Sequence, residues 1–555
     1  MKMDHPVSIA DYPDLDRRNF LKIAGGVTGT VLLSSALSTP LLAQSDPRPV
    51  PMPAITDPAV RALVFRGVQA AREAGAAYAE VRLTHGLIRS VDMVRIHDAQ
   101  TVHASVKTFV NGRWGFASGP LWDTEAIVAL ARRAVLQSAG KASEAGGPPL
   151  EFDALPARAR VPNAHWQMPV SIDPLSVHPY AIQDYLQGLA SQAQDGFGRR
   201  LNELVRLALD ARFFVQERAF GASDESYCTQ RLYLTSGSVQ LSLLVRGGGG
   251  AAQALQHVSP AGEGWELFTR QPLNDRIVET FRTMQMESAL PAKPVTPGAR
   301  TLVLDAVTVA RLVSQTIGAP SEIDRVLGYD AHAHGASYLN RPASMIDTFA
   351  VGSPLLTVTA NRSASGGAAT VHWDDEGVAP QPFTIVKAGV LHDYHLSREG
   401  VAWLKREQVT GRDQPYGVVS ASSAGGKPYI RTANLEIAPS TTQSGDAELM
   451  AQVGNGIVIE EGNVHLDPSR LNGIIVGGRA YEIKGGKKVA RLGNHAVVIH
   501  TPTLWKSLAV LGGANSAVRV GLAGTKGVPS QESYHSVTAV PAVFREQLVT
   551  DITLR

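Results

Sequence analysis

The sequence predicts an α+β protein in which an N-terminal α/β domain precedes a β-rich C-terminal domain of barrel-like or sandwich-like form. Three observations favour this class. The chain of 555 residues exceeds the usual size of a single domain. Its 52 glycines and 33 prolines indicate many turns and therefore much β structure. Pro291, Pro294 and Pro297 mark a boundary, after which helical spacing gives way to short strand-like runs.

The composition excludes several classes of function. Hydrophobic residues make up 44% of the chain and charged residues 18%, as expected for a globular protein. Lys and Arg number 52 against 50 Asp and Glu, so the net charge of +2 provides no field for binding nucleic acid. The single cysteine, Cys228, excludes an intramolecular disulfide framework and a cysteine-based zinc finger.

The N-terminus has the layout of an export signal. Two arginines are followed by an aromatic, an aliphatic and a basic residue: Arg17, Arg18, Phe20, Leu21 and Lys22. An apolar run rich in glycine and alanine then covers residues 23–42. Because glycines, serines and a proline interrupt this run, it is a poor membrane span, and a retained anchor is the weaker alternative. We predict a twin-arginine signal peptide over residues 1–44, no stable membrane span after its cleavage, and a periplasmic or other extracytoplasmic location.

The predicted N-terminal domain covers residues 58–290 and follows a proline-rich linker over 45–57. Apolar spacing and capping residues predict helices, and alternation predicts strands joined by an Asn-Gly turn. The expected helices are Pro58–Ala74, Asp123–Leu136, Tyr180–Gln194 and Asn202–Ala211, and the expected strands are Ala77–Leu83, Thr101–Val110 and Val239–Val245. The glycine run Gly247–Gly250 lacks the spacing of a phosphate-binding motif, so we interpret it as a loop.

The predicted C-terminal domain covers residues 298–555. Asp305 is expected to cap a helix that ends near Gly318. Most other segments are short strands bounded by Gly or Asn. They are Arg300–Leu304, Leu355–Ala360, Phe383–Val386, Val390–Tyr394, Gly456–Glu460, Gly473–Val476, Ala480–Ile483 and Ala496–His500.

A search of the residues for catalytic and metal-binding patterns finds weak candidates only. No histidine is followed by glutamate, and no serine stands in a Gly-x-Ser-x-Gly turn. His332 and His334 would point the same way on a strand and could bind a metal, although ordinary surface histidines are the commoner case. His392 and His395 would face opposite sides of a strand. The run Asp374-Asp375-Glu376 could bind a divalent cation, but a solvated acidic turn is favoured.

The stretch Leu312–Tyr329 resembles the zinc helix of the TldD/PmbA family, also called modulator of DNA gyrase. In that family the helix reads His-Glu-x-x-Gly-His and continues towards a Glu-x-Asp segment. Further segments follow in the order that the family shows: Gly367–Gly377, Val386–Leu391, Arg431–Leu435 and Tyr481–Lys487. With Ala77–Leu83 and Gly112–Ala117, which look like its N-terminal domain, the resemblance covers about residues 55 to 550.

The departures from the family pattern concern its zinc site. The resemblance implies that two histidines and a cysteine of a Cys-Gly-Lys-Gly-type loop bind zinc, with the glutamate as general base. Here Ser314 and Ala319 stand at the histidine positions, Gln315 at the glutamate and Ala523 near the cysteine. Serine and alanine cannot replace imidazole or thiolate, and glutamine cannot accept a proton at neutral pH. We therefore expect a degenerate zinc helix, no zinc and no other cofactor.

The resemblance also implies a role, because the family pairs a catalytic with a non-catalytic subunit. We predict a non-catalytic subunit of an exported proteolytic complex that binds an extended peptide and pairs with a homologous TldD/PmbA-type subunit. One alternative is an active metallopeptidase with displaced ligands such as His332, His334 or His372. Another is a periplasmic binding protein unrelated to proteolysis.

Overall fold

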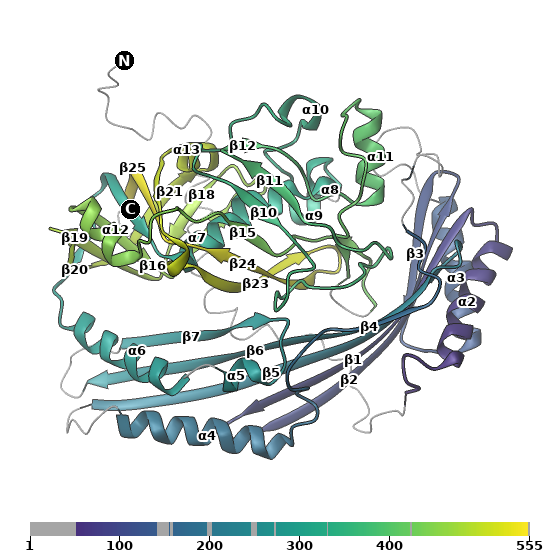
Figure 1. Cartoon of the computed structure of the whole chain (residues 1–555), viewed down its shortest axis with the longest axis horizontal. Coiled ribbons are helices and arrows are strands. Elements are labelled where there is room, and N and C mark those ends of the chain that lie inside the picture. The colour runs from purple at the N-terminus through teal and green to yellow at the C-terminus, as the bar shows by residue number, and fades with distance from the viewer. Residues whose placement is uncertain are drawn as a thin grey trace.

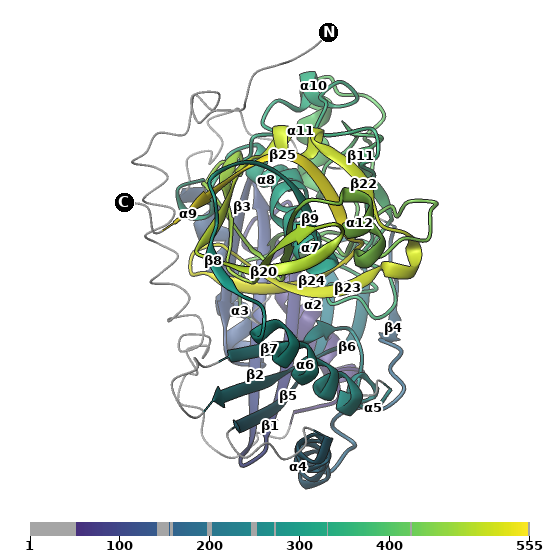
Figure 2. The ribbon, with the colours of Figure 1, turned by 90° about the vertical axis from the view of Figure 1, so that its left-hand side faces the viewer.

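The computed structural model describes residues 52–140, 155, 159–196, 203–245, 252–270, 273–329, 331–421 and 425–552. The predicted signal peptide and the glycine run Gly247–Gly250 lie outside these ranges. A long curved sheet from the N-terminal half runs beneath the strands of the C-terminal half (Figure 1). The same arrangement is visible after a quarter turn (Figure 2).

The described residues of the N-terminal half form one seven-stranded sheet in the order β3-β2-β1-β5-β6-β4, with β7 also paired to β6. Its strands are β1 (Tyr78–Asp92), β2 (Ile96–Val110), β3 (Arg113–Gly119), β4 (Ala164–Gln167), β5 (Glu203–Ala222), β6 (Tyr227–Val245) and β7 (Ala252–Ala261). The Asn111-Gly112 turn joins β2 to β3 as predicted, and both residues adopt positive φ.

Two pairs of helices cover this sheet at different places. Helices α2 (Pro58–Glu73) and α3 (Thr124–Gly140) pack on β1, β2, β3 and β5 near one end. Helices α4 (Pro179–Gly196) and α6 (Leu273–Ser288) pack on each other and on the sheet towards the other end, with the short α5 (Glu266–Thr269) nearby. The predicted helices over 58–74, 123–136 and 180–194 are thereby confirmed. None of the described helices is both long and apolar enough to span a membrane.

The predicted helix over 202–211 is wrong, because the described part of this stretch belongs to β5. Leu209, Ala211 and Phe213 are buried, whereas the side chains between them are more exposed. This two-residue alternation matches a strand with one face on the core. The strand is also paired along its length with β1 and β6, so tertiary pairing outweighs its local helical preference.

The described C-terminal half contains a ten-stranded and a six-stranded sheet, and a separate two-stranded pair of β13 (Val419–Ser420) with β14 (Tyr429–Ile430). Neither larger sheet closes into a barrel in the described residues, so the sandwich-like form of the prediction is the one confirmed. The ten-stranded sheet contains β8 (Ala292–Pro294), β9 (Gly298–Leu304), β16 (Gly456–Glu460), β17 (Asn463–Leu466), β18 (Asn472–Val476), β19 (Arg479–Lys484), β20 (Lys487–Gly493), β21 (His495–His500), β22 (Leu508–Leu511) and β25 (Ala542–Asp551). The six-stranded sheet runs β12-β11-β10-β15-β24-β23 and contains β10 (Val358–Ala360), β11 (Phe383–Lys387), β12 (Val390–Leu391), β15 (Leu435–Ile437), β23 (Val518–Lys526) and β24 (Gln531–Ala539).

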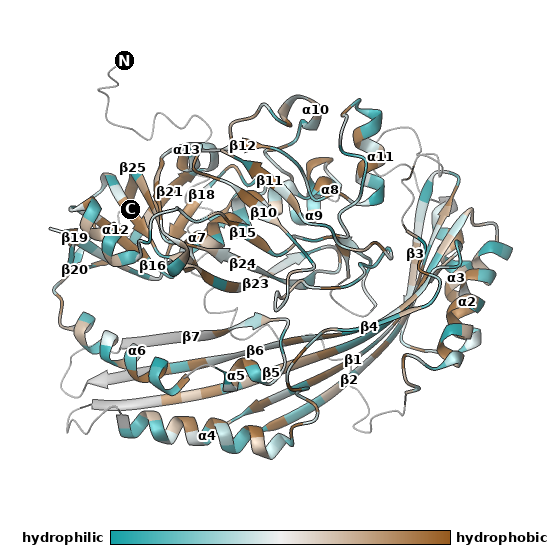
Figure 3. Ribbon diagram, viewed as in Figure 1, coloured by the Kyte–Doolittle hydropathy of each residue, from teal (hydrophilic) through white to brown (hydrophobic). Residues whose placement is uncertain are grey.

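Short helices complete the C-terminal half, and apolar segments concentrate along its central strands (Figure 3). Helix α7 (Ala306–Val313) is buried in the largest hydrophobic core, which also contains residues of both larger sheets. The other helical segments are η3 (Ser314–Gly318), η4 (Ala319–Ser321), α8 (Ile323–Val326), α9 (Ala331–His334), α10 (Pro342–Met345), α11 (Arg398–Arg406), α12 (Asp446–Val453), α13 (Thr501–Lys506) and η5 (Ala514–Ser516).

Candidate functional site

The candidate site is built on the turn that follows helix α7. Asp305 caps this helix, because its Oδ1 accepts a hydrogen bond of 2.9 Å from the Thr308 backbone N–H. The chain then widens into one π-helical turn, η3, and tightens into the 3-10 turn η4. Single π-helical turns are frequent at functional sites. This turn carries Ser314, Gln315 and Ala319, the positions that differ from the His-Glu-x-x-Gly-His pattern.

Each polar side chain of the degenerate motif is already engaged by another residue. Ser314 Oγ lies 2.9 Å from Nε2 of His535, which projects from β24, and both residues are buried. The Gln315 side-chain carbonyl accepts a hydrogen bond from the Arg470 guanidinium. Ala319 contributes a methyl group only. Of the positions that match the family's zinc ligands and general base, Ser314 therefore bonds to an imidazole and Gln315 to a guanidinium.

A second buried histidine supports the same turn. His395 Nε2 accepts the Ala433 backbone N–H at 3.0 Å, so its proton resides on Nδ1, which lies 2.9 Å from Ser321 Oγ. Burial lowers the pKa of His395 to about 3 and that of His535 to about 4. Both imidazoles are therefore neutral at physiological pH.

A buried ion network lies directly beyond the turn. Lys526 Nζ of β23 lies 2.7 Å from Glu322 Oε2 and 2.6 Å from Asp324 Oδ1. Glu322 also accepts from Thr432 Oγ1 at 2.8 Å and pairs with Arg325 at 3.3 Å. Burial alone would raise the pKa of Glu322, but Lys526 and Arg325 outweigh it and lower that pKa well below its usual range. Glu322 is thus ionised, and both acids of the Glu-x-Asp segment contact cations of the chain itself.

Ala523 is not brought to the motif turn. It pairs with Tyr534 across β23 and β24, one residue away from the Leu522–His535 pair, and it is exposed. Side chains alternate between faces of a strand, so Ala523 lies opposite His535. Lys526 lies on the inward face, and so does Gly524, where an added Cβ would meet no atom within 4 Å. In a Cys-Gly-Lys-Gly order the cysteine stands two residues before the lysine, which makes Gly524 the geometrically matching position.

Zinc, which the family implies, does not fit these residues. Its structural and catalytic sites use imidazole, thiolate or carboxylate ligands. Within the described ranges, no three His, Cys, Asp or Glu side chains are grouped as a metal site. The acceptor oxygen of Gln315 faces the guanidinium of Arg470, a cation that would repel a metal ion.

Of the three histidines considered as displaced ligands, His334 lies next to the ion network, where its backbone carbonyl accepts a hydrogen bond from Arg325. The expected strand around His332 and His334 is wrong, because both lie on helix α9, where residues two apart do not share a face. His372 stacks on Trp166 at a ring-centroid distance of 5.2 Å. His392 bonds to Asp347 at 2.6 Å and shares no site with His395.

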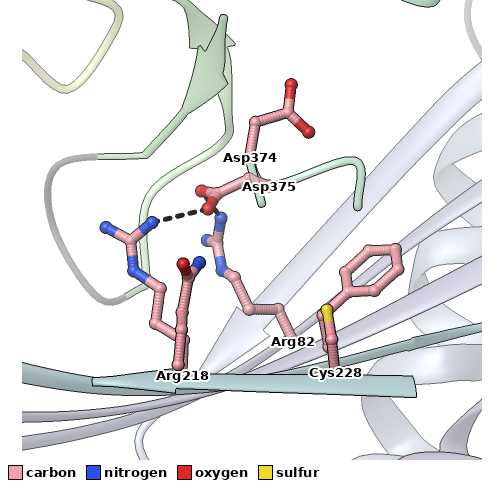
Figure 4. A pocket seen from close by; sticks show the side chains of 7 residues that line it. Arg82, Arg218, Cys228, Asp374 and Asp375 are labelled. Carbon is pink, nitrogen blue, oxygen red and sulfur yellow. Dashed lines mark hydrogen bonds and ion pairs between the residues drawn. The ribbon is translucent and has the colours of Figure 1, made fainter. Parts of the chain in front are cut away.

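The acidic run Asp374-Asp375-Glu376 is buried, and the expectation of a solvated turn is wrong. The guanidinium groups of Arg82 and Arg218 point at Asp375 (Figure 4). Its counter-ions come from the N-terminal sheet, which local sequence could not reveal. Arg82 and Arg218 both bind Asp375, the latter at 2.8 Å, and Lys107 binds Glu376 at 2.7 Å.

The electrostatics of this run follow from burial and from those partners. Burial and Glu376 raise the pKa of Asp374 to about 7, although three backbone N–H groups bond to its carboxylate. Burial opposes ionisation of Asp375, but Arg82 and Arg218 lower its pKa. A cavity of about 10 Å³, room for about one water molecule, lies beside Asp374 and Cys228. The run therefore joins the two halves of the molecule by buried ion pairs.

Sequence reasoning missed several residues that shape the site. His535, Arg470 and Lys526 lie 140 or more residues from the motif turn in sequence and meet it only through the fold. The lysine of the Thr525-Lys526-Gly527 loop was a usable signal, because the resembling family has a lysine in the corresponding loop. His535 and Arg470 carry no local signal.

Comparisons with known proteins agree with this fold. Residues 297–538 match the PmbA/TldA metallopeptidase C-terminal domain. A metalloprotease of Methanocaldococcus jannaschii is 27% identical over 178 residues, which is 32% of this chain and 35% of that protein. The chain thus matches about a third of the length of this relative.

Solved structures extend the likeness to most of the chain. A protein of Bacteroides thetaiotaomicron described as a candidate modulator of DNA gyrase has a TM-score of 0.66, 17% identity and coverage of 90% of this chain and 100% of its own. TldE of Thermococcus kodakarensis has a TM-score of 0.63, 12% identity and coverage of 89% and 100%. At this identity the likeness shows the shared fold. Together with the match over residues 297–538, it supports a relationship of the chain to the TldD/PmbA family of metallopeptidase-like proteins.

Proposed function

We propose that this chain is a non-catalytic, peptide-binding subunit of an exported TldD/PmbA-type proteolytic complex. The observation that carries the proposal is the state of the motif turn. Ser314 bonds to a neutral histidine and Gln315 to a guanidinium, so the turn offers neither zinc ligands nor a general base. A homologous subunit with the intact motif would supply the metal and the chemistry.

Less specific observations support peptide binding and pairing with a partner subunit. Strand β23 is the last strand of its sheet and offers nine residues to which an extended peptide could add as a further strand. The relative from Methanocaldococcus jannaschii is described as a metalloprotease, which agrees with a proteolytic setting. The twin arginines at 17 and 18 support export of the folded subunit together with its partner.

Metal content tests the non-catalytic role. We expect elemental analysis of the purified mature chain to find no stoichiometric zinc, and we expect no chelator-sensitive peptidase activity from it. The quadruple variant Ser314→His, Gln315→Glu, Ala319→His and Gly524→Cys should bind zinc, because its cysteine faces the turn. The matched quadruple variant with Ala523→Cys in place of Gly524→Cys should bind it more weakly. About one zinc per wild-type chain would refute the proposal.

Fractionation tests export. Replacing both Arg17 and Arg18 by Lys should retain the chain in the cytoplasm, together with any partner that lacks its own signal. The control is Lys22→Arg, which leaves the arginine pair intact and should be exported normally. Arrival of the double lysine variant in the periplasm would contradict the export route without bearing on metal binding.

A further inference from the structure

A cluster of four cations surrounds the ionised Glu322 next to the motif turn. Arg325 and Lys526 contact Glu322 directly. Arg431 and Arg470 interact electrostatically with Glu322, and each also interacts with Arg325. Because Arg470 bonds to Gln315, the cluster extends to the position of the family's general base.

The acids within this cluster do not balance its positive charge. Glu322 and Asp324 face the four cations and leave an excess of two positive charges. Asp467 also interacts with Arg470, and counting it leaves an excess of one. Burial and Arg325 lower the pKa of Arg470 to about 10, and burial lowers the pKa of Arg431. A buried charge without a counter-ion is costly, so the cluster favours an anion.

Guanidinium N–H groups are available to bind that anion. Among the described residues, Nη2 of Arg431 and Nε of Arg325 and Arg470 have no hydrogen-bond partner. Arg431 is only 4% exposed, and its Nε and Nη1 make long bonds of 3.4 and 3.3 Å to backbone carbonyls. A carboxylate could accept short, charge-assisted bonds from such groups.

The cluster reaches the molecular surface at Arg470. Arg325, Arg431 and Lys526 are buried, whereas Arg470 and Gln315 are partly exposed. The planar fork of arginine matches the two oxygens of a carboxylate.

We propose that this cationic cluster is a binding site for a carboxylate, either a small free carboxylate or the C-terminal carboxylate of a peptide. The site takes up an anion at the motif turn where relatives are expected to bind a metal cation. It goes beyond the proposed function and does not require the chain to be non-catalytic or exported.

Isothermal titration of the purified mature chain tests the site. The probes are sodium acetate, N-acetyl-Ala-Ala with a free C-terminus, and the same dipeptide with an amidated C-terminus. We expect the amide not to bind. Tighter binding of the free-acid dipeptide than of acetate identifies a peptide C-terminus, and binding of acetate alone identifies small carboxylates.

Variants locate the binding within the cluster. Arg431→Gln should weaken carboxylate binding at least tenfold, and so should Arg470→Gln, which alters a partly exposed residue and is the safer change for folding. Arg341→Gln, at an exposed arginine outside the cluster, should bind like the wild type. The proposal is overturned if neither carboxylate binds, if the amide binds equally well, or if Arg470→Gln and Arg341→Gln have the same affinity.

Discussion

At the scale of single residues, neutral buried histidines take part in the contacts of the motif turn. His535 fills space beside Ser314, and His395 connects Ser321 to the backbone of Ala433. Their lowered pKa values mean that neither can act as a strong base near neutral pH. Both hold the turn through hydrogen bonds, and protonation of His395 would break the bond that its Nε2 accepts from the Ala433 N–H.

These histidines should make the fold sensitive to acid. Below pH 6.5 the unfolded chain binds a proton at each imidazole, while the folded chain stays neutral down to about pH 4 at His535. The free energy of unfolding therefore decreases as the pH is lowered through this window, by about 1.4 kcal/mol per pH unit for each histidine.

The variant His535→Gln should remove one such contribution while keeping a side chain able to bond to Ser314. Urea unfolding at pH 6, 5 and 4.5 should show its free energy of unfolding falling less steeply than that of the wild type. His332→Gln, at an exposed position, should keep the wild-type slope. Equal slopes for His535→Gln and the wild type would mean that His535 is not held neutral.

At the scale of elements, local sequence was informative where one segment determines its own structure. Asp305 capping α7 and Asn111-Gly112 joining β2 to β3 required only neighbouring residues. The described part of the stretch 202–211, residues 203–211, forms a strand because β1 and β6 flank it, which its own composition did not reveal. The residues of the motif turn were recognised by their order, but their partners were not, because His535 and Arg470 come from distant strands and loops.

The carboxylates at 374–376 were misjudged for the same reason, since their counter-ions lie in the other half of the chain.

At the scale of the whole molecule, buried ion pairs join the N-terminal sheet to the C-terminal half. Asp375 is bound by Arg82 of β1 and Arg218 of β5, and Glu376 by Lys107 of β2. Lys107 also lies over the Trp114 ring at 4.0 Å. Such ion pairs add little stability compared with apolar packing, but removing one partner leaves the other buried charges without a counter-ion.

Replacing Asp375 by Asn should therefore lower the free energy of unfolding of the whole molecule and not only of one loop. Two buried guanidinium groups would lose their carboxylate, at a cost of about 3 to 5 kcal/mol. We expect a lower urea midpoint and faster hydrogen exchange in both β1 and β5. Asp413→Asn, at an exposed carboxylate, should leave both unchanged. A midpoint equal to that of the wild type would show that the junction does not depend on this carboxylate.

The contact between Arg470 and Gln315 bears on how this lineage could evolve. If a mutation restored glutamate at 315, its carboxylate would lie against the Arg470 guanidinium, which would lower its pKa and make it a poor proton acceptor. Catalysis by a chain with the restored motif would thus need a change at 470 as well, even where the substitutions restore zinc binding. The side chains that contact the motif turn thus limit which substitutions could give this chain a metal-dependent activity.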